Sequence, residues 1–184
     1  LSTMNNQLIT GGEHRYKAER SVRVRASLTP KTVTELTFAR ASRRRTDAGR
    51  ERFRIISNNG FLTISHRPTQ PLEFFIKLVG GYDRDRLHRL NSSIISIVPR
   101  VTYSFRGKGR ARLEADWANV QASRYATLPF EMVNGRRRGN SGRWHGSLDY
   151  RIGRNVSMLI NYDGRTDPQR PVVHTARAEV RAFF

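Results

Sequence analysis

Residues 172–184 alternate between two kinds of side chain without a break, and this alternation constrains the fold more than any other feature of the chain. One set of alternate positions is mostly apolar and consists of Val172, His174, Ala176, Ala178, Val180, Ala182 and Phe184. The positions between them are mostly polar or charged and consist of Val173, Thr175, Arg177, Glu179, Arg181 and Phe183. Because successive side chains of a β-strand point to opposite faces of a sheet, the pattern predicts a strand with one apolar and one charged face.

The same period of two recurs along the chain and predicts an all-β fold. It occupies residues 13–29, 32–38, 53–67, 72–82, 95–105, 110–117, 143–152 and 156–162. The Asn-Asn-Gly within 53–67 is a possible turn, but the Pro-rich segment that follows is a better one, so 53–67 is interpreted as one long strand. With the last stretch this gives about nine strands in an antiparallel up-and-down meander, whose short turns alternate with longer polar loops such as 42–51 and 123–142.

Matching the faces of neighbouring strands sets the register of two predicted hairpins. A turn centred on the proline of Thr-Pro-Lys places Arg25 opposite Glu35. A turn centred on the lysine of Gly-Lys-Gly places Arg100 opposite Asp116. Both pairs lie on the polar face, where each ion pair would contribute little to stability.

The charge balance of the chain is strongly basic. There are 34 Lys and Arg against 15 Asp and Glu, which gives a formal net charge of +19 and favours anionic partners such as nucleic acid, phosphate or acidic lipid. No cysteine is present, and the five histidines lack the spacing of metal ligands. No apolar run approaches the roughly 20 residues of a membrane-spanning helix, whereas a membrane barrel needs only alternation.

The alternating strands, the contrast between short turns and longer loops, and the terminal Phe184 resemble the outer-membrane β-barrel proteins of diderm bacteria. This resemblance implies that 13–184 is the C-terminal segment of a transmembrane barrel in a bacterial outer membrane, and that 1–12 is a loop or the end of a preceding strand. Because such barrels usually have an even number of strands, it also implies a missing N-terminal part of the same protein. In this family the barrel-assembly machinery reads the last strand, which implies an assembly signal at Val180, Ala182 and Phe184.

A barrel of this kind acts as a pore, a transporter or a membrane anchor, and the sequence leaves these three open. The predicted lumen is rich in arginine and contains the charge pairs Arg25–Glu35 and Arg100–Asp116. Loop arginines are predicted to form an external rim that binds lipopolysaccharide phosphates or attracts anionic solutes, through Arg43, Arg44, Arg45, Arg136, Arg137 and Arg138. No cofactor, metal site or catalytic residue is expected.

Two other functions fit parts of the sequence. A soluble all-β nucleic-acid-binding protein would use the basic face, but its aromatic side chains should then share that face, and here most lie on the apolar one, so no nucleic acid is expected as a partner. The His-x-Ser spacing of His145 and Ser147 resembles that of outer-membrane phospholipases, with Asp163 and Asn161 opposite them across the next turn. Those enzymes carry the pair on the lipid-facing surface, whereas here it lies on the polar face, so an enzyme is not expected.

Overall fold

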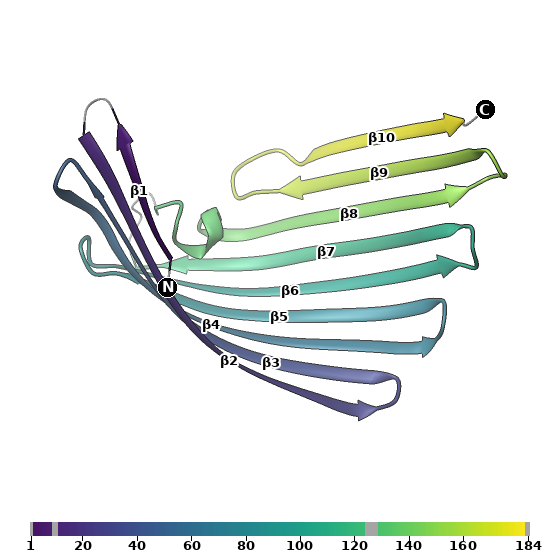
Figure 1. Cartoon of the computed structure of the whole chain (residues 1–184), viewed down its shortest axis with the longest axis horizontal. Helices are drawn as coiled ribbons and strands as arrows, with labels where there is room; N and C mark the ends of the chain where they lie inside the picture. Colours follow the sequence, from purple (N-terminus) through teal and green to yellow (C-terminus); the bar gives the residue numbers. More distant parts are fainter. Residues whose placement is uncertain (1, 9–10, 124–128, 183–184) are drawn as a thin grey trace.

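The structure, a computed structural model, describes residues 2–8, 11–123 and 129–182. Ten antiparallel strands form one sheet whose strand order follows the order of the chain, which confirms the predicted all-β meander (Figure 1). The strands are β1 (Ser2–Leu8), β2 (Gly11–Thr29), β3 (Thr32–Asp47), β4 (Arg50–Thr69), β5 (Leu72–Asp85), β6 (Leu90–Phe105), β7 (Gly109–Ala122), β8 (Gly139–Arg151), β9 (Val156–Thr166) and β10 (Val173–Ala182). A short 3₁₀ helix, η1 (Val133–Gly135), lies between β7 and β8.

The connections separate into two groups at opposite ends of the sheet (Figure 1). At one end, which we call the turn end, short turns join β2 to β3, β4 to β5, β6 to β7 and β8 to β9. The opposite end, which we call the loop end, carries the longer connections 86–89, 123–138 and 167–172. The described part of the chain contains no helix with the length and apolar character that a membrane crossing needs.

The predicted polar loop at 42–51 is wrong, because these residues belong to a hairpin. β3 continues to Asp47 and β4 begins at Arg50, which leaves Ala48 and Gly49 between them. Both residues have positive φ, 47° and 77°, as a tight two-residue hairpin turn requires. The end of β3 and the start of β4, which we call the hairpin extension, carry almost only polar side chains. They therefore lack the apolar alternation from which a strand can be recognised.

β4 is a single strand of 20 residues, which confirms the interpretation of 53–67 as one long strand. The Asn-Asn-Gly segment stays in register on both sides, with Asn59 opposite Ala39 of β3 and Gly81 of β5. The continuous pairing of β4 with β3 and β5 therefore excludes a turn at this point.

The two faces of the sheet differ in polarity. We call one the outer face and its apolar side chains the apolar band; many of them are exposed, including Val22, Val24, Leu36, Phe38, Ile76, Leu78, Ile95, Ile97, Leu113, Trp117, Ile160 and Val180. Their neighbours in sequence point to the opposite, inner face, where Arg25, Lys77 and Arg100 lie. The division of side chains between faces follows the alternation in the sequence.

One region of the inner face is buried, and it lies at the loop end. Six strand residues form its floor: Phe53, Ile55, Leu90, Ile94, Ala118 and Val120. Met132 and Val133, from the connection between β7 and β8, complete the cluster. The main apolar cluster of the described residues is therefore inside the curve of the sheet, beneath a loop.

The sheet is open. Within the described residues, β1 pairs with β2 alone and β10 with β9 alone, so each has one edge without a ladder. The first and last strands lie apart in Figure 1. An edge of this kind leaves backbone N–H and C=O groups available for pairing with another strand.

Candidate functional site

Residues 129–136, which we call the inner loop, fold back over the inner face at the loop end. The side chain of Met132 is fully buried and that of Val133 is 2% exposed. They pack in the cluster that contains Ile55, Ile94 and Val120. Burial of two such side chains stabilises the folded-back position by about 1.5–3 kcal/mol each.

Two hydrogen bonds fix the middle of the inner loop to the strands. The backbone N–H of Val133 donates to Oδ2 of Asp83 at 2.6 Å, and Asp83 is itself buried. A guanidinium N–H of Arg43 donates to the carbonyl oxygen of Glu131 at 2.8 Å. The first bond gives a buried donor a charged acceptor, and such bonds are among the stronger ones in proteins.

Arg136 fixes the end of the inner loop. Its side chain is only 10% exposed and donates to the carboxylate of Asp116 and, at 3.2 Å, to the hydroxyl of Ser141. Asp116 also accepts a hydrogen bond from the hydroxyl of Ser96 at 2.9 Å. A guanidinium with so little exposure requires a partner of this kind, because a buried unpaired charge is costly.

The predicted pair Arg100–Asp116 is wrong, and the register of one hairpin explains why. The turn between β6 and β7 is centred on Gly107, not on the lysine after it, so each residue of β6 faces a partner two positions earlier than predicted. Gly107 has a φ of 63°, which a residue without a Cβ adopts easily. Arg100 therefore faces Glu114, and its Nε lies 2.5 Å from the Glu114 carboxylate.

Glu114 joins two arginines on the inner face. Arg112 also donates to its carboxylate at 2.5 Å. The guanidinium of Arg100 lies over the ring of Phe75, 4.4 Å from its centre, so it has an aromatic as well as a carboxylate neighbour. These contacts hold the two guanidinium groups in fixed positions on the wall.

Arg25 lies opposite Glu35, as the predicted register requires. The ion pair itself comes from the diagonal neighbour Arg23, whose Nε lies 3.3 Å from the Glu35 carboxylate. Both charges are partly exposed, so this pair contributes little to stability.

The inner face also carries arginines without a carboxylate partner among the described residues. Arg143 and Arg165 lie directly opposite each other on β8 and β9. They line a hollow of about 720 Å³ together with Asp116, Trp144 and Asp163, among others. The hollow is also lined by the carboxylates of Glu114, Asp116 and Asp163, so charges of both signs lie beside the inner loop.

The structure divides the six arginines that were predicted to form one external rim. Arg43 and Arg45 point to the inner face from β3, and Arg44, between them, points to the outer face. Arg136, at the end of the inner loop, keeps only 10% of its side chain exposed and points to Asp116, whereas Arg137 and Arg138 are exposed. Arg43 and Arg136 therefore hold the inner loop and are not part of an external rim.

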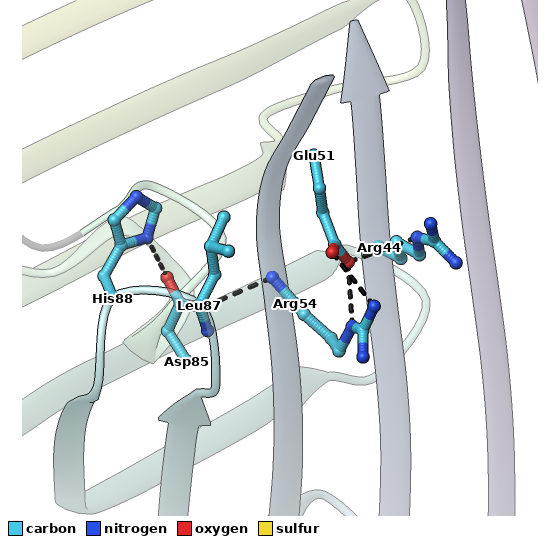
Figure 2. Close-up of polar contacts among 6 residues, drawn as sticks. All are labelled: Arg44, Glu51, Arg54, Asp85, Leu87 and His88. Carbon is cyan, nitrogen blue, oxygen red and sulfur yellow. Dashed lines mark hydrogen bonds and ion pairs between the residues drawn. The ribbon is translucent and has the colours of Figure 1, made fainter. Parts of the chain in front are cut away.

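Arg44 belongs to a charge cluster on the outer face, beyond the apolar band. Its Nε lies 3.1 Å from the carboxylate of Glu51, and Arg54 donates two hydrogen bonds to the same carboxylate at 2.8 and 2.9 Å (Figure 2). The hydrogen bond from Arg54 lowers the pKa of Glu51 below its ordinary value. This carboxylate therefore stays ionised over a wide pH range and is shared by both arginines.

Asp85 organises the loop between β5 and β6, beyond the apolar band. Its fully buried carboxylate accepts hydrogen bonds from the backbone N–H groups of Arg54 at 3.2 Å and Leu87 at 2.9 Å, and lies 2.5 Å from Nδ1 of His88 (Figure 2). Burial by itself raises the pKa of Asp85, but the hydrogen bonds from His88, Leu87 and Arg54 outweigh it and hold the pKa below its ordinary value. The carboxylate is therefore a fixed acceptor within the wall.

The predicted opposition of His145 to Asp163 and of Ser147 to Asn161 is confirmed in register. Nδ1 of His145 lies 2.7 Å from Oδ1 of Asp163. Ser147 follows two positions along the strand, about 6.6 Å away at the usual rise, and the described contacts include no hydrogen bond between it and His145. The described hydrogen bond of His145 is thus the one with Asp163.

The remaining site predictions concern the end of the chain and metals. Val180 lies on the outer face and is 64% exposed, and Ala182 follows on the same face at the end of β10. Phe184 lies outside the described residues. Within the described ranges, no group of three or more His, Asp or Glu side chains is placed to hold a metal ion.

The inner loop is the feature that sequence reasoning missed. Its signal is the apolar pair Met132–Val133 inside a segment that otherwise ends in three consecutive arginines. Two adjacent apolar side chains are unfavourable in a solvated loop and indicate that the segment is buried against the sheet. Its partner Asp83 carries no local signal, because the contact joins positions 50 residues apart.

No described protein family and no curated protein matches this sequence. Among solved structures, the chain is similar to the outer-membrane expressed OmpT of Vibrio cholerae, with a TM-score of 0.61 and 8% identity over 88% of this chain and 52% of that one. It thus spans about half the length of that protein. It is also similar to the NanC porin, with 10% identity over 94% of this chain and 98% of that one, but the TM-score of 0.44 is too low to support a conclusion. The first similarity shows the fold: the sheet is of the outer-membrane β-barrel kind.

Proposed function

We propose that this chain forms part of the wall of a β-barrel pore in a bacterial outer membrane, and that the pore favours anionic solutes. One observation carries the proposal: the inner loop is fixed against an arginine-rich inner face by Asp83, Asp116 and Arg43. A segment held over the inner face narrows the passage at the loop end. Guanidinium groups beside the narrowing stay charged at every relevant pH and attract anions.

The outer face supports a location in lipid. Large apolar side chains are exposed along it from β2 to β10, for example Val24, Leu78, Leu113 and Val180. A soluble protein rarely exposes a continuous apolar surface of this extent, whereas a membrane barrel requires one. Trp117, 56% exposed toward the loop end of the band, has the position of an interfacial aromatic side chain.

The open edges of the sheet support a larger barrel. Unpaired backbone groups are not tolerated in the hydrocarbon of a membrane, so β1 and β10 each need a partner strand there. We infer that a missing N-terminal part of the same protein supplies these strands. The proposed partner in closing the barrel is the barrel-assembly machinery, which would bind Val180, Ala182 and Phe184. Replacing Phe184 with Ala should then lower the yield of folded protein in membranes.

The structure gives less support to the other functions. A nucleic-acid binder needs aromatic faces that are free for base stacking on its basic surface. The inner-face rings of Phe61 and Phe75 are instead covered by Lys77 and Arg100. We assign no catalytic role to His145, and a pore needs none.

Conductance of the full-length protein in planar lipid bilayers tests the proposal. Replacing both Arg143 and Arg165 with Gln should shift the reversal potential in a salt gradient toward that of a less anion-selective channel, and more strongly at low salt. Arg154→Gln, in an exposed turn at the opposite end, is the control and should leave selectivity unchanged. A parent protein that forms no channels, or channels without preference for anions, would refute the proposal.

A further inference from the structure

A groove of about 470 Å³ opens on the outer face, where β2, β3 and β4 pass from the apolar band into their polar extensions. Two rows of outer-face residues line it. Cross-strand register places Arg20, Arg40 and Asn58 in the row nearer the loop end, and Val22, Phe38 and Gly60 in the row nearer the turn end. The groove is therefore polar along one side and apolar along the other.

The polar row contains two positive charges that face each other. Arg20 and Arg40 are directly opposite in the ladder, and both are exposed. Neither guanidinium has a carboxylate partner among the described residues. Like charges at directly opposite positions destabilise a sheet unless something between them is negative.

The next arginines on the same face have a partner. Arg44 and Arg54, which lie closer to the loop end, share the carboxylate of Glu51 (Figure 2). Arg20 and Arg40 thus differ from Arg44 and Arg54 in having no carboxylate contact, and they lie in the row that borders the apolar band. In a membrane barrel, that border lies at the boundary between hydrocarbon and head groups.

The apolar row leaves room for a chain. Val22 is 67% exposed and Phe38 is 60% exposed. Gly60 has no side chain, and a Cβ placed on it would be in van der Waals contact with the ring of Phe38, 3.5 Å away, so the ring and the bare backbone of Gly60 form the apolar wall of the groove. The two rows are two residues apart along each strand, or about 6.6 Å, a spacing that places a head group directly above an acyl chain.

We propose that this groove binds a phosphate-bearing lipid, with a phosphate between Arg20 and Arg40 and an acyl chain along Val22, Phe38 and Gly60. Planar guanidinium groups bind phosphate oxygens in pairs, and Asn58 offers an amide donor beside them. The apolar row distinguishes a lipid from free phosphate, because inorganic phosphate has nothing to place there. This inference rests on the proposed function only in that the outer face must lie in lipid.

Lipid retention by the full-length protein in detergent tests the groove without reference to conductance. The probes are diphosphorylated lipid A and the same lipid without its phosphates, each added to the purified protein and counted by native mass spectrometry. The parent should retain the phosphorylated form about tenfold better, as expected for charge-assisted hydrogen bonds to two guanidinium groups. Added inorganic phosphate should displace it poorly.

Three variants separate the two halves of the groove. Arg20→Gln with Arg40→Gln should remove the preference for the phosphorylated lipid. Gly60→Leu keeps both charges but fills the apolar row, so it should weaken retention of both lipids. Arg154→Gln, in a turn at the opposite end, serves as the matched loss of one arginine and should change nothing.

The outcomes distinguish this inference from the pore proposal. Equal retention of both lipids by the parent would refute lipid binding in the groove, even if the protein conducts ions. An unchanged preference in the Arg20/Arg40 double variant would refute it as well. Displacement of the lipid by inorganic phosphate at comparable concentration would identify a site for free anions and refute the assignment of a lipid as its ligand. A clear phosphate-dependent preference that needs both arginines supports the groove even if no channel is recorded. Arg20→Lys with Arg40→Lys, which keeps the charge, replaces the Gln variant if that variant does not fold, and should retain less phosphorylated lipid than the parent.

Discussion

Replacing Asp83 with Ala should release the inner loop from the wall. The Asp83 carboxylate accepts the N–H of Val133 at 2.6 Å in a buried position, and Ala leaves that donor without an acceptor. A hydrogen bond to a charged group contributes about 1.5–3 kcal/mol, so a loss of about 2 kcal/mol should raise the undocked population about 30-fold. The loop should still dock most of the time, because burial of Met132 and Val133 is retained.

A buried cysteine can report this undocking, because the chain has no cysteine of its own. Val120 lies beneath the inner loop on β7 and is 1% exposed, so Val120→Cys should react with a water-soluble maleimide only when the loop is away. When undocking is fast compared with labelling, the labelling rate follows the undocked fraction. The Asp83→Ala background should therefore label about 30-fold faster than the Val120→Cys parent.

Two controls make the result specific. Ser27→Cys, at an exposed position on β2, should label at one rate in every background. Asp149→Ala removes an exposed inner-face carboxylate far from the inner loop and should leave Val120→Cys protected. A labelling rate in Asp83→Ala within about threefold of the parent would contradict the assignment of this hydrogen bond as the main polar anchor.

Three further predictions concern the wall itself. Gly164→Ala should lower the free energy of unfolding by about 1–3 kcal/mol in urea titrations, because a Cβ there would overlap the indole of Trp144; Gly80→Ala, which meets nothing within 4 Å, should not. Brominated acyl chains should quench the fluorescence of Trp117 and Trp144, and quenching by aqueous iodide alone would place the apolar band in water. The pKa of Asp85 is held below its ordinary value of 3.8, so its stabilisation of the 86–89 loop is present at neutral pH and is lost as the pH falls from 3.8 through the lowered value. Amide hydrogen exchange at 86–89 should then rise over this pH range. In Asp85→Asn, which has no carboxylate to titrate, the same fall in pH should cause no such rise.

Much of the fold can be predicted because alternation is a local property. Each strand in the apolar band carries its own period-two signal, and the β2–β3 register follows from one proline turn. The signal fails where both faces are polar, as in the hairpin extension around Ala48 and Gly49. It also does not distinguish a turn centred on Gly107 from one centred on the next residue. That difference of one residue changes the partner of Arg100 from Asp116 to Glu114.

The site is less predictable because it depends on contacts between distant positions. Arg43 and Arg136 belong to clusters of consecutive arginines, and sequence alone does not separate them from their neighbours. Their roles follow from Glu131 and Asp116, which the fold brings to them from other elements. His145 and Asp163 were correctly placed, since they lie on one hairpin with a short turn.

The order of the strands in the sheet has a consequence for assembly. Each strand from β2 to β9 pairs with the strands before and after it in the chain, so every hairpin can form with only a short loop to close. Growth from one hairpin to the next leaves only the two outermost strands with an open edge, and each new strand pairs with the edge left by the last. The slow step is then pairing across β1 and β10, because those edges must meet partners far away along the chain or outside it. A helper that holds an open edge until that pairing occurs would act at β10, where the exposed outer row ends.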